Sequence, residues 1–135
     1  SMANLTALAV ARHAKLGDRI SGAAVYLSDQ THSSVGKGLR ILGFGADQIR
    51  VIPSGADFRI SVEALWRQVM ADREAGLRPF ALIANAGTTN TGAIDPLRDL
   101  AAFCREHGLW MHVDGAYGAA AVISDSGRAL LDGIG

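Results

Sequence analysis

The chain has 135 residues, of which 49% are hydrophobic and 19% charged, which is enough for one folded domain with a real core. Its 13 basic residues balance 13 acidic ones, and no basic stripe suits nucleic acid. The single cysteine, Cys104, excludes a disulfide framework or CxxC metal site within this sequence. No apolar run reaches transmembrane length and no signal peptide is visible, so we expect a cytoplasmic protein with no membrane partner and no metal site.

Apolar periodicity predicts helices and strands in strict alternation along the chain. Segments with a helical stripe of apolar residues are predicted as helices: 1–17, 33–42, 62–75, 95–107 and a short one at 126–131. Short, continuously apolar runs are predicted as strands: 22–27, 48–52, 80–85 and 109–114. Strands that are apolar throughout are typical of a parallel sheet covered on both faces, so the predicted fold class is α/β.

Two helix starts carry capping signals. Ser61 is predicted to cap the helix over 62–75, whose apolar face would include Trp66. Asp95-Pro96 predicts the next helix, with Asp95 as the N-cap residue and Pro96 as the first helical residue.

Polar residues follow three of the predicted strands, in loops that carry His32, Thr88-Thr89 and Asp114. In a parallel sheet these loops lie at one edge, where ligands bind. Asp114 ends an apolar run and is followed by small residues, which predicts a carboxylate in a crowded site.

Each of these residues also has a plainer interpretation. Asp114 could start a turn, His32 could cap a helix, and the threonines could satisfy backbone groups in a turn. His112 could orient Asp114 or simply lie in the core. No complete dinucleotide fingerprint, phosphate loop or nucleophile elbow is present, and His112 with Asp114 alone is weak support for a metal.

Together these loops resemble a known family, the pyridoxal-phosphate-dependent amino-acid decarboxylases of the aromatic-amino-acid and glutamate decarboxylase group. The matching segments are SDQTHSS at 28–34, AGTT at 86–89, HVDGAY at 112–117 and, at the start, SMANL at 1–5. The resemblance implies the large domain of fold-type-I enzymes that use pyridoxal 5′-phosphate.

The resemblance also implies roles for five residues. His32 would stack on the cofactor ring and Asp114 would bind its ring nitrogen, which makes these two the expected catalytic residues. Thr89 would lie beside the cofactor, Ala116 would pack on the opposite face of the ring, and Ser1 would help to hold the phosphate. The implied partners are an amino-acid substrate and a second copy of the protein, in a homodimer or larger assembly.

The sequence departs from the family at the lysine that binds the cofactor covalently, which the family has downstream of the aspartate. Lys15 and Lys37 are the only lysines, and both precede Asp114. We therefore expect residues 1–135 to be part of the cofactor-binding large domain, without the N-terminal segment, the lysine region and the small C-terminal domain.

The complete protein is expected to be a carboxy-lyase, and this chain alone to be inactive. The alternatives are another fold-type-I activity, such as a transaminase, an aldehyde synthase or a desulfurase, or a non-catalytic α/β binding or assembly module.

Overall fold

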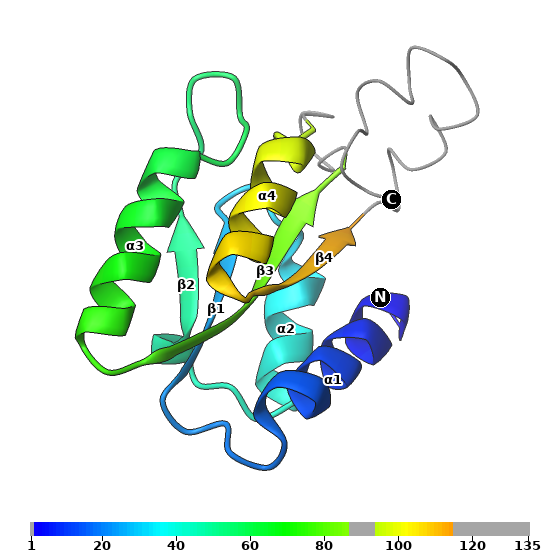
Figure 1. The fold of residues 1–135 in the computed structure, drawn as a ribbon. Coiled ribbons are helices and arrows are strands. Elements are labelled where there is room, and N and C mark those ends of the chain that lie inside the picture. The colour runs from blue at the N-terminus through cyan, green and yellow to red at the C-terminus, as the bar shows by residue number, and fades with distance from the viewer. Residues whose placement is uncertain (1, 87–93, 115–135) are drawn as a thin grey trace.

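The structure is a computed structural model that describes residues 2–86 and 94–114, with side chains described from residue 5 onward. Helices and strands alternate along the chain (Figure 1). The helices are α1 Met2–Leu16, α2 Ser33–Ile41, α3 Val62–Glu74 and α4 Leu97–His107, with a short 3-10 helix at Ala46–Gln48. The strands are β1 Ala23–Ser28, β2 Ile49–Ile52, β3 Arg78–Asn85 and β4 Trp110–Asp114. The helix expected at 126–131 lies outside the described residues.

The strands form one sheet in the order β2-β1-β3-β4, and every neighbouring pair is parallel. All of them therefore end at the same edge, which is the upper edge in Figure 1. The predicted parallel α/β fold is confirmed for the described residues.

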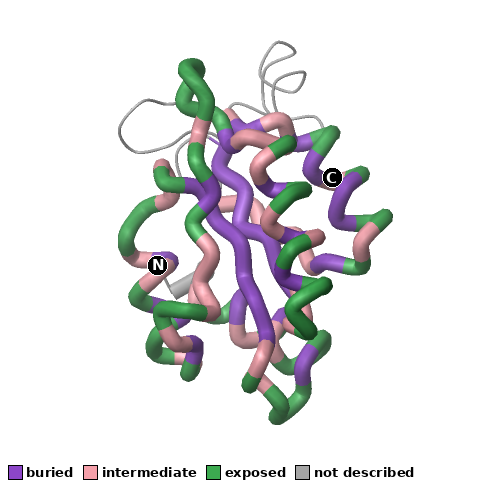
Figure 2. The backbone as a smooth tube through the Cα atoms, turned by 90° about the vertical axis from the view of Figure 1, so that its left-hand side faces the viewer, coloured by how far each residue is buried: buried purple, intermediate pink, exposed green. Residues whose placement is uncertain are grey.

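Helices cover both faces of this sheet, as predicted. On one face, Leu8 of α1 and Leu39 of α2 pack in a cluster with Val25. On the other face, Leu65 of α3 and Leu100 of α4 pack in a cluster with alternate strand residues such as Leu82. Figure 2 shows the result: strands β1 and β3 form a buried layer between helices whose outer surfaces are exposed.

Helix α3 begins as the sequence predicts but buries a narrower face. The Ser61 hydroxyl accepts a hydrogen bond from the Ala64 amide at 3.1 Å, which is the expected cap. Trp66 was expected in the apolar face, and this is wrong, because its side chain is 51% exposed. Leu65, Val69 and Asp72 are the buried residues, and Trp66 points about 100° away from Leu65 around the helix axis.

The predicted start of α4 is also wrong by one residue. The helix begins at Leu97 with Pro96 in the N-cap position, and no side chain caps it. The Asp95 carboxylate instead accepts hydrogen bonds from the backbone amides of Ile60 and Asn85. The Asp95 carboxylate therefore binds residues distant in the sequence and does not cap the helix that follows it.

Candidate active site at the carboxyl edge of the sheet

The chain leaves β1 and β3 toward opposite faces of the sheet. Helix α2 follows β1 and packs with α1, whereas α4 follows β3 and packs on the face that α3 covers. β1 and β3 are neighbours in the sheet. Such a point of divergence at the carboxyl ends of parallel strands is where open α/β sheets bind ligands. The sequence-predicted residues His32 and Asp114 both lie at this edge.

His32 is the N-cap residue of α2, and its side chain is exposed. Its Nδ1 atom accepts a hydrogen bond from the Ser34 amide at 3.1 Å and lies 2.8 Å from the Ser34 hydroxyl oxygen. Both contacts are made by the same ring nitrogen, Nδ1. Ser34 therefore fixes the orientation of the His32 ring.

Asp114 is the last residue of β4 and lies opposite Asn85 of β3. Its carbonyl oxygen accepts a hydrogen bond from the Ala86 amide at 3.0 Å, which continues the sheet up to this residue. The residue is half-buried, and its charge acts on the neighbouring His112. A half-buried carboxylate of this kind is suited to a cationic ligand group.

His112 lies two residues before Asp114, so the two side chains share one face of β4. This is the face covered by α1 and α2, because Trp110, on the same face, packs against their cluster. Burial lowers the pKa of His112, and the neighbouring Asp114 opposes that shift. His112 is therefore neutral at physiological pH.

Three residues that the sequence analysis did not single out join this edge: Ser28, Thr31 and Asn85. The Asn85 side-chain amide donates hydrogen bonds to the hydroxyl oxygens of Ser28 and Thr31, each at 3.3 Å. Ser28 and Thr31 lie in the segment SDQTHSS at 28–34, in which only His32 was given a role, and the signal for Asn85 was a polar residue at the end of an otherwise apolar strand.

Asp95 is also buried at this edge, behind Asn85. Its carboxylate oxygens lie 2.7 Å from the Asn85 amide nitrogen and 2.9 Å from that of Ile60. Burial raises the pKa of Asp95, and the two backbone hydrogen bonds counteract part of that rise.

The remaining predicted residues, Ser1, Thr89 and Ala116, lie outside the described residues. Helix α1 begins at Met2, directly after Ser1, and it packs beside β4 on the face that carries Asp114 (Figure 1).

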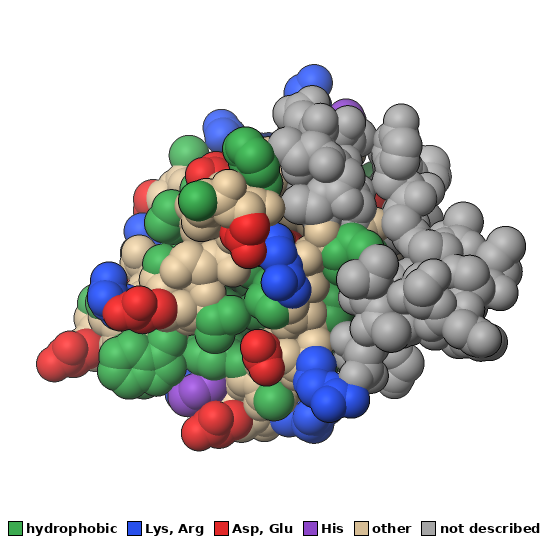
Figure 3. All heavy atoms as spheres, turned by 90° about the horizontal axis from the view of Figure 1, so that it is seen from above, with side chains coloured by type: hydrophobic (Ala, Val, Ile, Leu, Met, Phe, Trp, Pro, Cys, Tyr) green, Lys and Arg blue, Asp and Glu red, His purple; other side chains and the backbone are tan. Residues whose placement is uncertain are grey.

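The surface above this edge carries both signs of charge. Figure 3 looks down on it and shows acidic and basic side chains interspersed over its described part. Within the described residues, no three His, Cys, Asp or Glu side chains are grouped as metal ligands would be.

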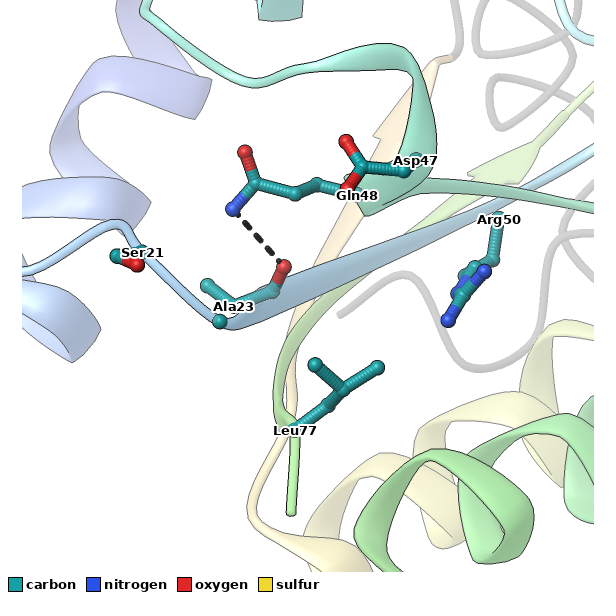
Figure 4. A pocket seen from close by; sticks show the side chains of 7 residues that line it. Ser21, Ala23, Asp47, Gln48, Arg50 and Leu77 are labelled. Atoms are coloured by element: carbon teal, nitrogen blue, oxygen red, sulfur yellow. Dashed lines mark hydrogen bonds between the residues drawn. The ribbon is translucent and has the colours of Figure 1, made fainter. Parts of the chain in front are cut away.

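A cavity of about 280 Å³ lies at the opposite end of the sheet, near the amino ends of the strands (Figure 4). Ser21, Gln48 and Arg50 are among the residues that line it. The Gln48 amide already donates to the carbonyl oxygens of Ile20 and Ala23, so it serves the local fold. The sequence-predicted site residues do not line this cavity.

A parallel sheet with helices on both faces and a carboxylate at its carboxyl edge defines an α/β protein of the kind that binds a cofactor there. The conserved domain described as "Pyridoxal-dependent decarboxylase" matches residues 7–135. The chain belongs to this family.

Similar proteins cover almost the whole chain. An aromatic-L-amino-acid decarboxylase of Bacillus atrophaeus is 54% identical over 134 residues, which is 99% of this chain and 28% of that protein. The cysteine sulfinic acid decarboxylase of Homo sapiens is 37% identical over 141 residues, 99% of this chain and 29% of that protein.

Solved structures agree with the fold. The crystal structure of Rhodiola rosea 4-hydroxyphenylacetaldehyde synthase is 38% identical, with a TM-score of 0.93 over 98% of this chain and 30% of that one. A structure of Oryza sativa TDC with PLP is 39% identical, with a TM-score of 0.91 over 98% of this chain and 30% of that one. The chain thus spans under a third of the length of these relatives.

The described residues fit the family's cofactor, pyridoxal 5′-phosphate. Its pyridine nitrogen is cationic when protonated, and the Asp114 carboxylate at the strand end is a suitable partner. His32 supplies a flat ring at the start of the helix on the same sheet face.

No described helix is long and apolar enough to cross a membrane.

Proposed function

We propose that the complete protein is a pyridoxal-phosphate-dependent carboxy-lyase that removes carbon dioxide from an amino acid. The observation that carries this proposal is the placement of the half-buried Asp114 carboxylate at the carboxyl end of β4, the edge of the sheet at which His32 also lies. Family membership and the relatives with decarboxylase names support it. Residues 1–135 would be the central part of the cofactor-binding domain.

The cofactor, when bound, supplies an electron sink for the electron pair left as carbon dioxide departs. Asp114 would bind the protonated ring nitrogen and hold the proton there through its negative charge. His32 would pack its imidazole on the ring and limit access of water. Ser1, Thr89 and Ala116 would complete the cofactor contacts, at the phosphate, beside the cofactor and on the second face of the ring.

The experiment uses the full-length protein with pyridoxal phosphate and a panel of aromatic and acidic amino acids. We expect carbon dioxide and the corresponding amine in equal amounts. An aldehyde or a keto acid in place of the amine would instead support aldehyde formation or transamination and overturn the proposal.

Asp114→Asn tests the site itself. We expect kcat/KM to fall by roughly two to three orders of magnitude, because a preorganised charge in the transition state contributes about 3–4 kcal/mol. Asp18→Asn is the matched control, since Asp18 is an exposed carboxylate in the loop after α1. Equal rates for the two variants would contradict the role of Asp114.

We also propose a cytoplasmic homodimer as the form of the complete protein. The described surface carries several large exposed apolar side chains, which support association: Val10, Ile41, Val51, Phe58 and Trp66. Light scattering of the full-length protein at moderate salt is the measurement, and a stable monomer would contradict the dimer.

A further inference from the structure

Buried polar residues are concentrated at one place in the described part of the chain. Ser28, Asn85 and Asp95 are each at most 3% exposed, and they lie together at the carboxyl ends of β1 and β3. Asp72 on α3 is the other buried polar residue of this part. Because burial of a polar group is unfavourable unless it is hydrogen-bonded, such a cluster at a candidate site has a structural role.

The Asn85 side chain reaches across to the segment that follows β1. Its Nδ2 atom donates to the hydroxyl oxygens of both Ser28 and Thr31. The same hydroxyls also accept backbone hydrogen bonds: Ser28 from the Gln30 amide at 3.0 Å, and Thr31 from the Ser28 amide at 3.1 Å. The two hydroxyls close a tight turn, and Asn85 binds that turn as a unit.

This turn leads directly into His32. Thr31 precedes it in the chain, and the Thr31 amide donates to the Ser28 carbonyl oxygen at 3.1 Å. The position of the His32 backbone therefore depends on the turn, and the position of the turn depends on the Asn85 amide.

The main chain at Asn85 is fastened on its other sides. The Asn85 amide donates a hydrogen bond to the Asp95 carboxylate at 2.7 Å. The Asn85 carbonyl oxygen accepts one from the Asp95 amide at 2.9 Å. The next residue, Ala86, donates to the carbonyl oxygen of Asp114. Asn85 thus contacts the turn before His32 with its side chain, and its backbone is part of the strand pair that carries Asp114.

We propose that Asn85 is a positioning residue that sets the His32 ring relative to the Asp114 carboxylate. This proposal rests on the proposed function, because it assumes that the two side chains bind one ring. The Asn85 side chain acts on His32 through the Ser28–Thr31 turn, to which its amide donates.

The test uses the full-length protein loaded with pyridoxal phosphate. Asn85→Ala removes the amide donor, and we expect the cofactor dissociation constant to rise about tenfold, the amount expected for loss of such hydrogen bonds. We also expect the visible circular dichroism of the bound cofactor to weaken, since the ring would be held less firmly. Asn85→Thr keeps one donor and should restore part of both signals.

A double-mutant cycle with His32→Ala adds a readout that a purely structural role would not change. If Asn85 acts through His32, the double variant should bind cofactor no more weakly than His32→Ala alone. Tyr26→Phe is the matched control, because it removes a buried hydrogen bond from β1, the strand that leads into the turn. It should lower Tm and leave the affinity for cofactor unchanged.

An Asn85→Ala protein that loses Tm as Tyr26→Phe does, with unchanged affinity and dichroism, would overturn the proposal. If Asn85→Ala does not fold, the same measurements are made on Thr31→Val, which removes one of the two hydroxyl acceptors of the Asn85 amide. Asp114→Asn is measured in parallel. If that variant retains the kcat/KM of the Asp18→Asn control, the proposed function fails; if its kcat/KM falls while the Asn85 and Thr31 variants bind cofactor normally, only the positioning role fails.

Discussion

Among residues 5–86 and 94–114, two groups of polar side chains are largely removed from water, and they differ in what they bind. The edge network consists of Ser28, Thr31, Asn85 and Asp95 at the carboxyl ends of the strands. The helix cluster consists of Tyr26, Arg50, Gln68 and Asp72, between β1, β2 and α3. Both are largely removed from water, and both contain a buried carboxylate.

In the helix cluster, side chains bind side chains. The Asp72 carboxylate accepts a hydrogen bond from Tyr26 at 2.7 Å and from Gln68 at 2.9 Å, and it lies 3.1 Å from the Arg50 guanidinium. Burial and the neighbouring carboxylate raise the pKa of Tyr26, so it stays a neutral donor. This cluster joins a helix to the sheet and leaves the Asp72 carboxylate fully occupied.

In the edge network, side chains bind mainly backbone atoms. Asp95 holds two amides, and the hydroxyls of Ser28 and Thr31 hold the turn before His32. Such bonds determine the path of the chain. We therefore expect the helix cluster to govern stability and the edge network to govern the site.

The largest effect is expected from Asp72→Ala in the helix cluster. Removing the carboxylate takes away the shared acceptor of Tyr26, Gln68 and the partly exposed Arg50, and each buried polar group left unpaired costs roughly 1–3 kcal/mol. Urea denaturation should show a lower midpoint, while cofactor affinity of the folded protein stays unchanged. A loss of cofactor affinity at full folding would contradict the separation of the two groups.

Asp95→Ala should have a smaller effect on stability and a clear effect on the site. Each unpaired buried amide costs roughly 1–3 kcal/mol, and the amides of Asn85 and Ile60 would lose their acceptor. We expect a lower Tm together with weaker cofactor binding. Asp95→Asn keeps one acceptor oxygen, so its Tm and cofactor affinity should lie between those of Asp95→Ala and those of the unchanged protein. An unchanged affinity in both variants would place Asp95 outside the site.

His112 should give the protein a measurable dependence of stability on pH. Burial lowers its pKa below the ordinary 6.5, so between the lowered value and 6.5 the unfolded chain binds more protons than the folded one. Stability therefore falls as the pH is lowered through this window, with a slope of at most about 1.4 kcal/mol per pH unit. Denaturation of His112→Gln across the same range should show a flatter profile; an identical profile would show that His112 does not contribute.

The smallest effect concerns Cys104, which is buried on α4. Burial raises the pKa of its thiol to about 12. Because the thiolate is the reactive form, native Cys104 should be alkylated far more slowly than an unfolded thiol. Peptide mapping after brief treatment with iodoacetamide, with and without urea, measures this; rapid labelling in the native protein would contradict it.

The sequence predicted the fold well because local patterns determine it. The apolar runs that became β1 and β3 and the spacing of Leu65 and Val69 on α3 report burial directly. The prediction for Trp66 was wrong because α3 buries a face that is narrower than its set of apolar residues. Asp95 failed because its partners, Ile60 and Asn85, come from other elements.

Prediction of the candidate site was partial for the same reason. His32 and Asp114 could be proposed because each follows a strand, and parallel strands end at one edge. Asn85 could not, since its importance depends on hydrogen bonds to a turn on the neighbouring strand. The register that brings β1 and β3 together is not encoded in any single segment.

The hydrogen bonds between the residues that flank 87–93 have a consequence for engineering. Ala86 and Ile94 form a bridge, and Asp95 bonds twice to Asn85, so both ends of this segment are joined to the sheet. The entropy of closing a loop grows slowly with its length, by about 0.6 kcal/mol per doubling. Insertions between these anchors that retain Thr89 should therefore leave the scaffold intact.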